Sequence, residues 1–228
     1  MSRKRDDDRS MIERLFAILD ALASENAGSL PLRELAKRAE LAPSTAHRIL
    51  AQCVDWGGIE RNDAGEYQLG LKLWKLGLRY PEAWRIRDVA VPVLQDLYEL
   101  THESVQLAVR DGYAALYVQR YAGRAAITQR PVLGRRVPLH GTAAGQVLLA
   151  HADSEVFERV TSASLMGYTP ATLTRKEDLA ERCRAIRREG IVRLGPEFVP
   201  GSSSVAAPVW NDRGRVAAAV SIILPSGT

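Results

Sequence analysis

Cysteine is scarce in this chain: Cys53 and Cys183 are the only two among 228 residues, and they lie far apart. Such usage favours neither a disulfide framework nor a metal cluster and is typical of a reduced, cytoplasmic protein. The four histidines are scattered without ligand-like spacing. No stretch approaches the roughly 20 apolar residues that a membrane span needs. We therefore expect no metal, no cofactor and no membrane association.

Catalytic motifs are missing as well. The chain has no Gly-x-Ser-x-Gly elbow, no glycine-rich phosphate loop ending in Lys-Ser/Thr and no dinucleotide fingerprint. His140 could act as a general base for Ser202 or Ser204, but nothing in the sequence brings these side chains within hydrogen-bond reach. No catalytic residue is assigned, and a small-molecule hydrolase is the least favoured alternative.

The length of the chain fits two domains, one small and one of about 150 residues. A net charge of +4 and a pI of about 9.2 suit an anionic partner without demonstrating one. Residues 1–9 are charged, lack an apolar core and are predicted to be a disordered tail, not a signal peptide.

Two short amphipathic helices joined by a turn are predicted between residues 32 and 53. The first has its apolar stripe at Leu32, Leu35, Ala36 and Ala39. The second repeats that spacing at Ala46, Ile49, Leu50 and Cys53. Pro43 cannot continue the first helix but can begin the second. This pattern indicates a helix-turn-helix pair.

The second helix of this pair has a polar face opposite its apolar stripe. Ser44 and Arg48 lie on that face, flanked by Thr45, His47 and Gln52. Hydroxyls at a helix N-terminus can meet phosphates or base edges, and Arg48 would add a charged contact one turn further on. The alternative is an ordinary solvated helix, because most polar helix faces bind nothing.

The flanking segments complete a winged helix-turn-helix domain over residues 10–70. Ser10 and Glu13 fit a capping box that starts a helix before the pair. After Gly57-Gly58, residues 59–61 and 66–69 indicate a hairpin. Its acidic residues suggest only light contact with DNA. The candidate DNA-binding residues are Arg33, Ser44, Thr45, His47, Arg48, Gln52 and Arg61.

Residues 71–80 are predicted to be a basic, leucine-bearing linker helix that ends at Pro81. An apolar linker helix in a DNA-binding protein more often packs on a second subunit than on nothing. We expect it to pair two winged-helix domains, giving a homodimer or homotetramer on a roughly palindromic double-stranded DNA operator.

Residues 81–228 are predicted to form an α+β domain, a mixed sheet flanked by helices. A helical stripe over 86–100 contains Pro92, which is expected to force a kink or an early break. The other predicted elements are strands at 105–110, 113–120, 205–210 and 216–223 and helices at 142–150 and 177–188.

Small residues gather at 141–145 and 201–204 in this domain. Small side chains leave room beside the backbone, and amides and hydroxyls exposed there can hold a carboxylate or hydroxyl. The alternative is a tight turn and a strand start where only small residues fit.

Five segments carry a resemblance to a known family: residues 44–50 and 67–70 in the first half, and 138–150, 188–190 and 206–211 in the second. Together they resemble the IclR family of bacterial transcriptional regulators, in the right order over about residues 10–224. The resemblance implies a GAF-like effector-binding domain after the winged helix. It also implies a pocket for a small organic effector, with a carboxylic acid among the candidates, lined by Ala143, Ala144, Leu194, Ser202, Ser204 and Ser221.

The chain departs from the family pattern at particular positions. Gln146 stands where the family usually has Lys, and Cys53 replaces a usual Leu. Members usually continue into one more helix beyond the position of Thr228, and we expect this final family helix to be absent here. The function expected is a one-component transcriptional regulator, repressor or activator, with a ligand sensor acting through a protein partner as the alternative.

Overall fold

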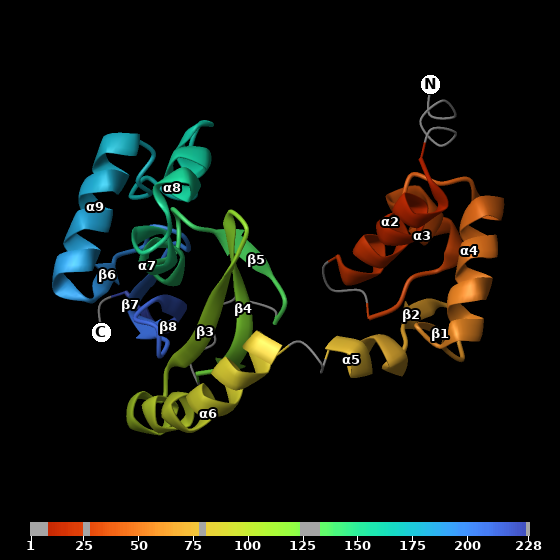
Figure 1. Cartoon of the computed structure of the whole chain (residues 1–228), viewed down its shortest axis with the longest axis horizontal. Helices are drawn as coiled ribbons and strands as arrows, with labels where there is room; N and C mark the ends of the chain where they lie inside the picture. Colours follow the sequence, from red (N-terminus) through yellow and green to blue (C-terminus); the bar gives the residue numbers. More distant parts are fainter. Residues whose placement is uncertain (1–8, 25–27, 78–80, 124–132, 227–228) are drawn as a thin grey trace. The chain divides into compact units, whose positions relative to one another are not determined.

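The structure is a computed structural model that describes residues 9–24, 28–77, 81–123 and 133–226. The chain divides into two compact units, Met1–Pro81 and Glu82–Thr228 (Figure 1). Most of the predicted tail, residues 1–8, lies outside the described residues. Arg9 belongs to the fold, because its Nη2 donates to the Glu40 carbonyl at 2.6 Å. No helix in the described ranges is long and apolar enough to cross a membrane.

The core of the first unit is built on the helices α2 (Met11–Ala23), α3 (Leu32–Arg38) and α4 (Pro43–Trp56). α2 starts at the predicted capping box, in which the Ser10 hydroxyl accepts from the Glu13 amide and the Glu13 carboxylate accepts from the Ser10 amide. α4 ends at Gly57, whose φ of 81° is readily available only to glycine. The predicted helix-turn-helix pair is confirmed.

The apolar stripes of these helices meet in one core. All four stripe residues of α4 are buried, as the 3.6-residue period requires, while Leu32 in α3 is only partly buried. The core residues that the three helices contribute include Ile18, Ala21, Leu22, Leu35, Ala36, Ala46, Ile49 and Leu50. Burial of this stripe fixes which side of α4 remains at the surface.

The wing is a two-stranded antiparallel hairpin of β1 (Ile59–Arg61) and β2 (Tyr67–Leu69), as predicted. Gly70 follows it and donates to the Gly58 carbonyl at 2.8 Å. A Cβ at position 70 would lie 2.5 Å from the Gly57 carbonyl oxygen, so only glycine fits there. The next helix, α5 (Leu71–Gly77), begins with the Leu71 amide bonded to the Glu60 carboxylate at 3.0 Å. The end of the predicted linker helix, residues 78–80, lies outside the described residues.

A six-stranded sheet in the order β5-β4-β3-β8-β7-β6 forms the centre of the second unit. Its strands are β3 (Ser104–Asp111), β4 (Ala114–Tyr121), β5 (Arg136–Pro138), β6 (Val192–Leu194), β7 (Ser202–Trp210) and β8 (Val216–Pro225). Each neighbouring pair is antiparallel, so the prediction of a mixed sheet is wrong. The reason is local: β3 to β4 and β7 to β8 are tight hairpins, and β8 returns beside β3 in the opposite direction.

Helices cover both faces of this sheet. α6 (Pro81–Thr101) packs Leu94 against Val105 and Leu107, which are alternate residues of β3. α7 (Ala143–Ala150) covers the other face, next to α8 (Ser154–Thr161) and α9 (Lys176–Glu189). The predicted break at Pro92 is wrong, because α6 continues through it. Pro92 is exposed, so the carbonyl that loses its helical partner faces water.

Candidate nucleic-acid interface and ligand cavity

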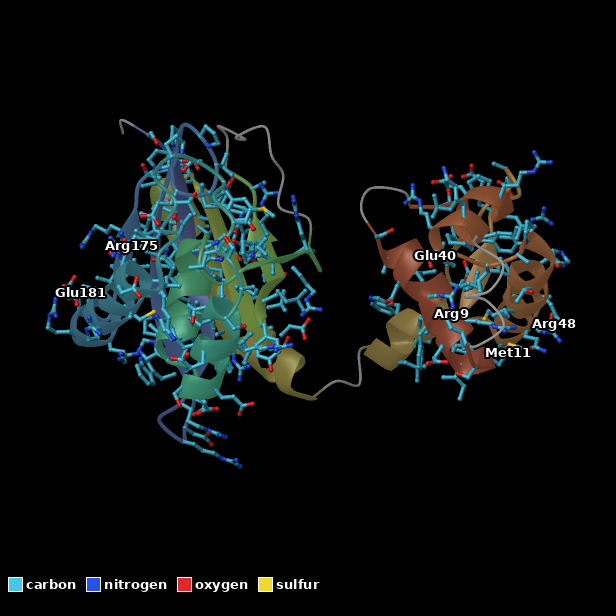
Figure 2. All side chains as sticks on the ribbon, turned by 90° about the horizontal axis from the view of Figure 1, so that it is seen from above. Arg9, Met11, Glu40, Arg48, Arg175 and Glu181 are labelled. Atoms are coloured by element: carbon cyan, nitrogen blue, oxygen red, sulfur yellow. The ribbon has the colours of Figure 1, made fainter. Side chains whose placement is uncertain are left out.

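The polar face of α4 lies at the surface of the first unit. Ser44, His47, Arg48 and Gln52 are exposed, and Thr45 is half-buried. Figure 2 shows Arg48 projecting from α4. The buried stripe on the opposite side holds the helix in place, so these five side chains can meet a partner without any rearrangement of the core.

The N-terminus of α4 is open to an anion. Its N-cap is Ala42, Pro43 occupies the first turn, and among the described residues no side chain caps the helix. Its first turn also lacks an acidic residue. The first amides of a helix have no partner inside the helix, and the helix dipole favours negative charge there. The Ser44 and Thr45 backbone can therefore bind a phosphate.

The two candidate arginines outside α4 differ in their freedom. Arg33 is exposed near the start of α3. Arg61 is held within the wing: its Nε donates to the Gly65 carbonyl at 2.8 Å and its guanidinium lies 5.7 Å from the centroid of the Tyr67 ring. Glu66, one of the acidic residues expected to weaken wing contact, accepts from the Ser29 hydroxyl at 2.6 Å.

A cavity of about 70 Å³ lies in the second unit, between the sheet and the start of α7. One water needs about 10–15 Å³ of such space, so there is room for a small organic molecule. The cavity is lined by Ser104, Gln106, Tyr117, Arg120, Arg135, Val137, Thr142, Ala143, Ala144, Phe198, Val199, Ser202, Ser204, Ser221 and Ile223.

Five of the six predicted pocket positions line this cavity: Ala143, Ala144, Ser202, Ser204 and Ser221. Leu194 does not. It lies on the edge strand β6, paired with Ser204, and is only 4% exposed in the core that α7 and α9 cover. The prediction placed it one strand too close to the cavity.

The charged and polar lining was not predicted from the sequence. The guanidinium-bearing residues Arg120 and Arg135 line the cavity, and its described lining includes no Asp or Glu. Burial raises the pKa of Tyr117 to about 12, against the opposing effects of its hydrogen bond with Thr142 and the charge of Arg135. The phenol is therefore protonated at neutral pH and can donate a hydrogen bond.

The start of α7 forms one wall of the cavity. The Thr142 hydroxyl accepts from the Gly145 amide at 3.1 Å, and the Thr142 carbonyl accepts from Gln146 at 2.8 Å. The amides of Ala143 and Ala144, at the first two helical positions, come before the first bonds of the helix ladder. A wall of two helix-terminal amides, facing arginines and a neutral phenol, suits an anion such as a carboxylate.

Gln146 lies behind this wall and does not line the cavity. Its Nε2 donates to the His140 carbonyl at 2.7 Å and to Glu197 at 3.1 Å, and its Oε1 accepts from Arg182 at 3.2 Å. Arg182 also pairs with Glu197 at 3.1 Å. This buried network joins α7, α9 and the segment carrying Phe198. It gives Gln146 a structural role that the sequence left open.

The arrangement does not support the hydrolase alternative. His140 Nε2 donates to the Met166 carbonyl at 2.9 Å, and His140 is not part of the cavity lining. The Ser202 hydroxyl donates to the Val199 carbonyl at 2.8 Å. His140 and Ser202 thus each bond to a backbone carbonyl and not to one another, as activation of a Ser202 nucleophile by His140 would require.

Two family models match the chain. The model of bacterial transcriptional regulator IclR C-terminal matches residues 79–228, and that of the IclR helix-turn-helix domain matches residues 11–63. The HTH-type transcriptional regulator XynR of Escherichia coli (strain K12) is 33% identical over 213 residues, which cover 92% of this chain and 84% of that protein. The HTH-type transcriptional regulator KipR of Bacillus subtilis (strain 168) is 29% identical over 195 residues, covering 85% and 78%.

Solved structures give the same picture. An IclR homolog from Microbacterium hydrocarbonoxydans, crystallised in complex with 4-hydroxybenzoate, is similar to this chain with a TM-score of 0.91 and 32% identity, covering 96% of this chain and 90% of that one. HmgR of Pseudomonas aeruginosa has a TM-score of 0.78 and 26% identity, covering 93% and 88%.

Proposed function

Since the chain belongs to the IclR family of bacterial transcriptional regulators, we propose that it binds an operator through the outward face of α4 and that a small organic acid in the cavity changes that binding. The observation that carries the first half is the uncapped, exposed start of α4 with Arg48 one turn further on. Ser44 and Thr45 hold a phosphate, while His47, Arg48 and Gln52 face the base edges.

The cavity lining supports a carboxylate as the common feature of the effector. The two arginines supply positive charge, and the first amides of α7 supply donors. The structurally similar homolog that was crystallised with 4-hydroxybenzoate supports the same class of ligand. A ligand can change operator affinity only by binding one arrangement of the DNA-binding units better than another. The expected coupling is about 1–3 kcal/mol.

The proposed regulator acts as a homodimer or homotetramer on a roughly palindromic operator. Support comes from α5, where Leu71, Trp74 and Leu76 are all more than half exposed, an apolar surface that suits a second copy of the chain. Sedimentation of the full chain at micromolar concentration checks this part, and a monomer alone would remove it.

The test is selection of duplex DNA from a random pool by the full chain, followed by fluorescence anisotropy with and without 4-hydroxybenzoate. Arg48→Ala should weaken binding to the selected operator by about 1–3 kcal/mol. Arg175→Ala is the matched control, since it removes an exposed arginine from the second unit and should leave operator affinity unchanged. Failure to enrich any sequence would contradict the operator function, and an unchanged affinity of Arg48→Ala would remove Arg48 from the contact.

A further inference from the structure

The side chain of Gln106 is completely buried, yet both of its polar atoms lack a hydrogen-bond partner in the described part of the chain. Buried amides are nearly always paired, because an unpaired donor and an unpaired acceptor each lose their bonds to water without replacement. Gln106 lines the cavity. The missing partner is therefore expected to come from whatever the cavity holds.

The sheet fixes where this amide lies. Gln106 is in the middle of β3, which is flanked by β4 and β8, so its backbone is held on both sides. Arg120 of β4 and Ser221 of β8 lie directly opposite it in the register, and both line the cavity. Residues directly opposite one another share a face of the sheet. Arg120, Gln106 and Ser221 therefore form a polar row across the cavity floor.

We propose that Gln106 determines the specificity of this cavity by selecting acids that also carry a hydroxyl group. The inference rests on the proposed effector site. A hydroxyl donates to the Gln106 Oε1 and accepts from its Nε2, so one small group pairs both atoms. The acid group of the same ligand binds at the start of α7, where Ala143 and Ala144 line the same cavity as Gln106.

Other ligand groups leave part of the amide unpaired. A second carboxylate can only accept, so the Gln106 Oε1 would stay without a donor. An ammonium group can only donate, and it would lie among the positive charges of Arg120 and Arg135. An apolar group would leave both the Oε1 and the Nε2 of Gln106 buried without a hydrogen-bond partner. A site of this kind rejects the ligand that lacks the hydroxyl, because the protein's own polar atoms then remain unpaired.

Calorimetry on the full chain with 4-hydroxybenzoate and benzoate tests the proposal, since these acids differ by one hydroxyl. The 2-hydroxy and 3-hydroxy isomers and the aliphatic pair 3-hydroxybutyrate and butyrate extend the test to other positions and shapes. We expect the hydroxylated member of at least one pair to bind about tenfold or more tightly than its partner. In Gln106→Leu, which keeps the size but removes the amide, the two members should bind equally.

Gln119→Leu is the matched control. It makes the same change on the neighbouring strand, but Gln119 pairs with Leu107 in the register and so faces α6 and not the cavity. The preference for the hydroxyl should survive in this variant. If Gln106→Leu does not fold, Gln106→Met, a flexible side chain without a hydrogen-bonding amide, takes its place.

Each outcome decides the proposal. Equal binding of both members of each pair by the wild-type chain, as expected if a bound water pairs with Gln106, would overturn it and leave the effector site standing. A preference that persists in Gln106→Leu would also overturn it. If none of the acids binds, both this inference and the acid effector fail, while operator binding without ligand remains as a separate result.

Discussion

The two binding regions use the same backbone feature, the start of a helix, in opposite surroundings. α4 begins at the surface, and among the described residues no side chain caps its first turn. α7 begins inside the second unit, with all eight of its residues buried and the Thr142 hydroxyl as its cap. Salt screens exposed charges far more than buried ones. DNA binding should therefore depend on ionic strength, whereas ligand binding should depend on matching hydrogen bonds.

Salt should affect the two binding regions most differently. Raising the salt concentration from about 50 to about 200 mM should weaken operator binding about 10³-fold if the α4 helices of two copies meet about six phosphates, because each contact releases counterions. The affinity for 4-hydroxybenzoate should change by less than about threefold, since its charge is neutralised inside the protein. Anisotropy and calorimetry in the same buffers measure the two responses. A flat operator response would favour a sensor that acts through a protein partner.

Alkaline pH should destabilise the second unit, which holds the cavity. Burial raises the pKa of Tyr117 to about 12 and that of Cys183 to about 11, from ordinary values of 10.0 and 9.0. Both groups stay neutral in the folded state to higher pH than in the unfolded chain. The stability they contribute is fully present below about pH 9 and is lost as the pH rises through 11 and 12. A shift of about two units corresponds to roughly 2–3 kcal/mol for each group.

Tyr117→Phe isolates one of these groups. The free energy of unfolding from urea titrations at pH 8 and pH 12 should fall by about 2–3 kcal/mol less in this variant than in the wild type. Tyr113→Phe is the control, because Tyr113 is half exposed. An equal alkaline loss in Tyr117→Phe and the wild type would mean that the buried phenol is not responsible.

A larger side chain in the cavity should produce the smallest of the three effects. Ser204→Leu fills space on the cavity floor. Binding of the acid ligand should therefore become weaker by about 1–3 kcal/mol through overpacking. Operator affinity without ligand should stay within about twofold. Ser203→Leu is the control, since Ser203 alternates to the opposite face of β7. Loss of folding in Ser204→Leu alone would mean that Ser204 is only a packing residue.

Local patterns predicted the first unit well. The α4 stripe, the Ser10 capping box and the glycine after α4 are each decided by residues a few positions apart, so the sequence contains the needed information. The short strands β5 and β6, of three residues each, and the helix α8 were not predicted. Three residues are too few to show a period of two. β1 and β2 are equally short, but the glycine-containing turn between them indicated a hairpin, whereas β6 depends on pairing with the distant strand β7.

The cavity shows the limit of sequence reasoning. The glycine- and alanine-rich start of α7 was visible, but Arg120, Arg135 and Gln106 meet only through the register of β3, β4 and the turn before β5. One signal was present: Ser104 and Gln106 alternate with Val105 and Leu107 in β3, which places polar residues on a buried face. That alternation identified a strand, but only its neighbours reveal what its polar side faces.

The glycine between the wing and α5 has a mechanical consequence. Gly70 bonds to Gly58, and Leu71 bonds to Glu60, so the first residues of α5 are fastened at two points to the segment that follows α4. A side chain at position 70 would collide with the backbone of Gly57 and Gly58. These two bonds tie the start of α5 to the segment that leaves α4, so a rotation of α5 would act directly on the end of α4.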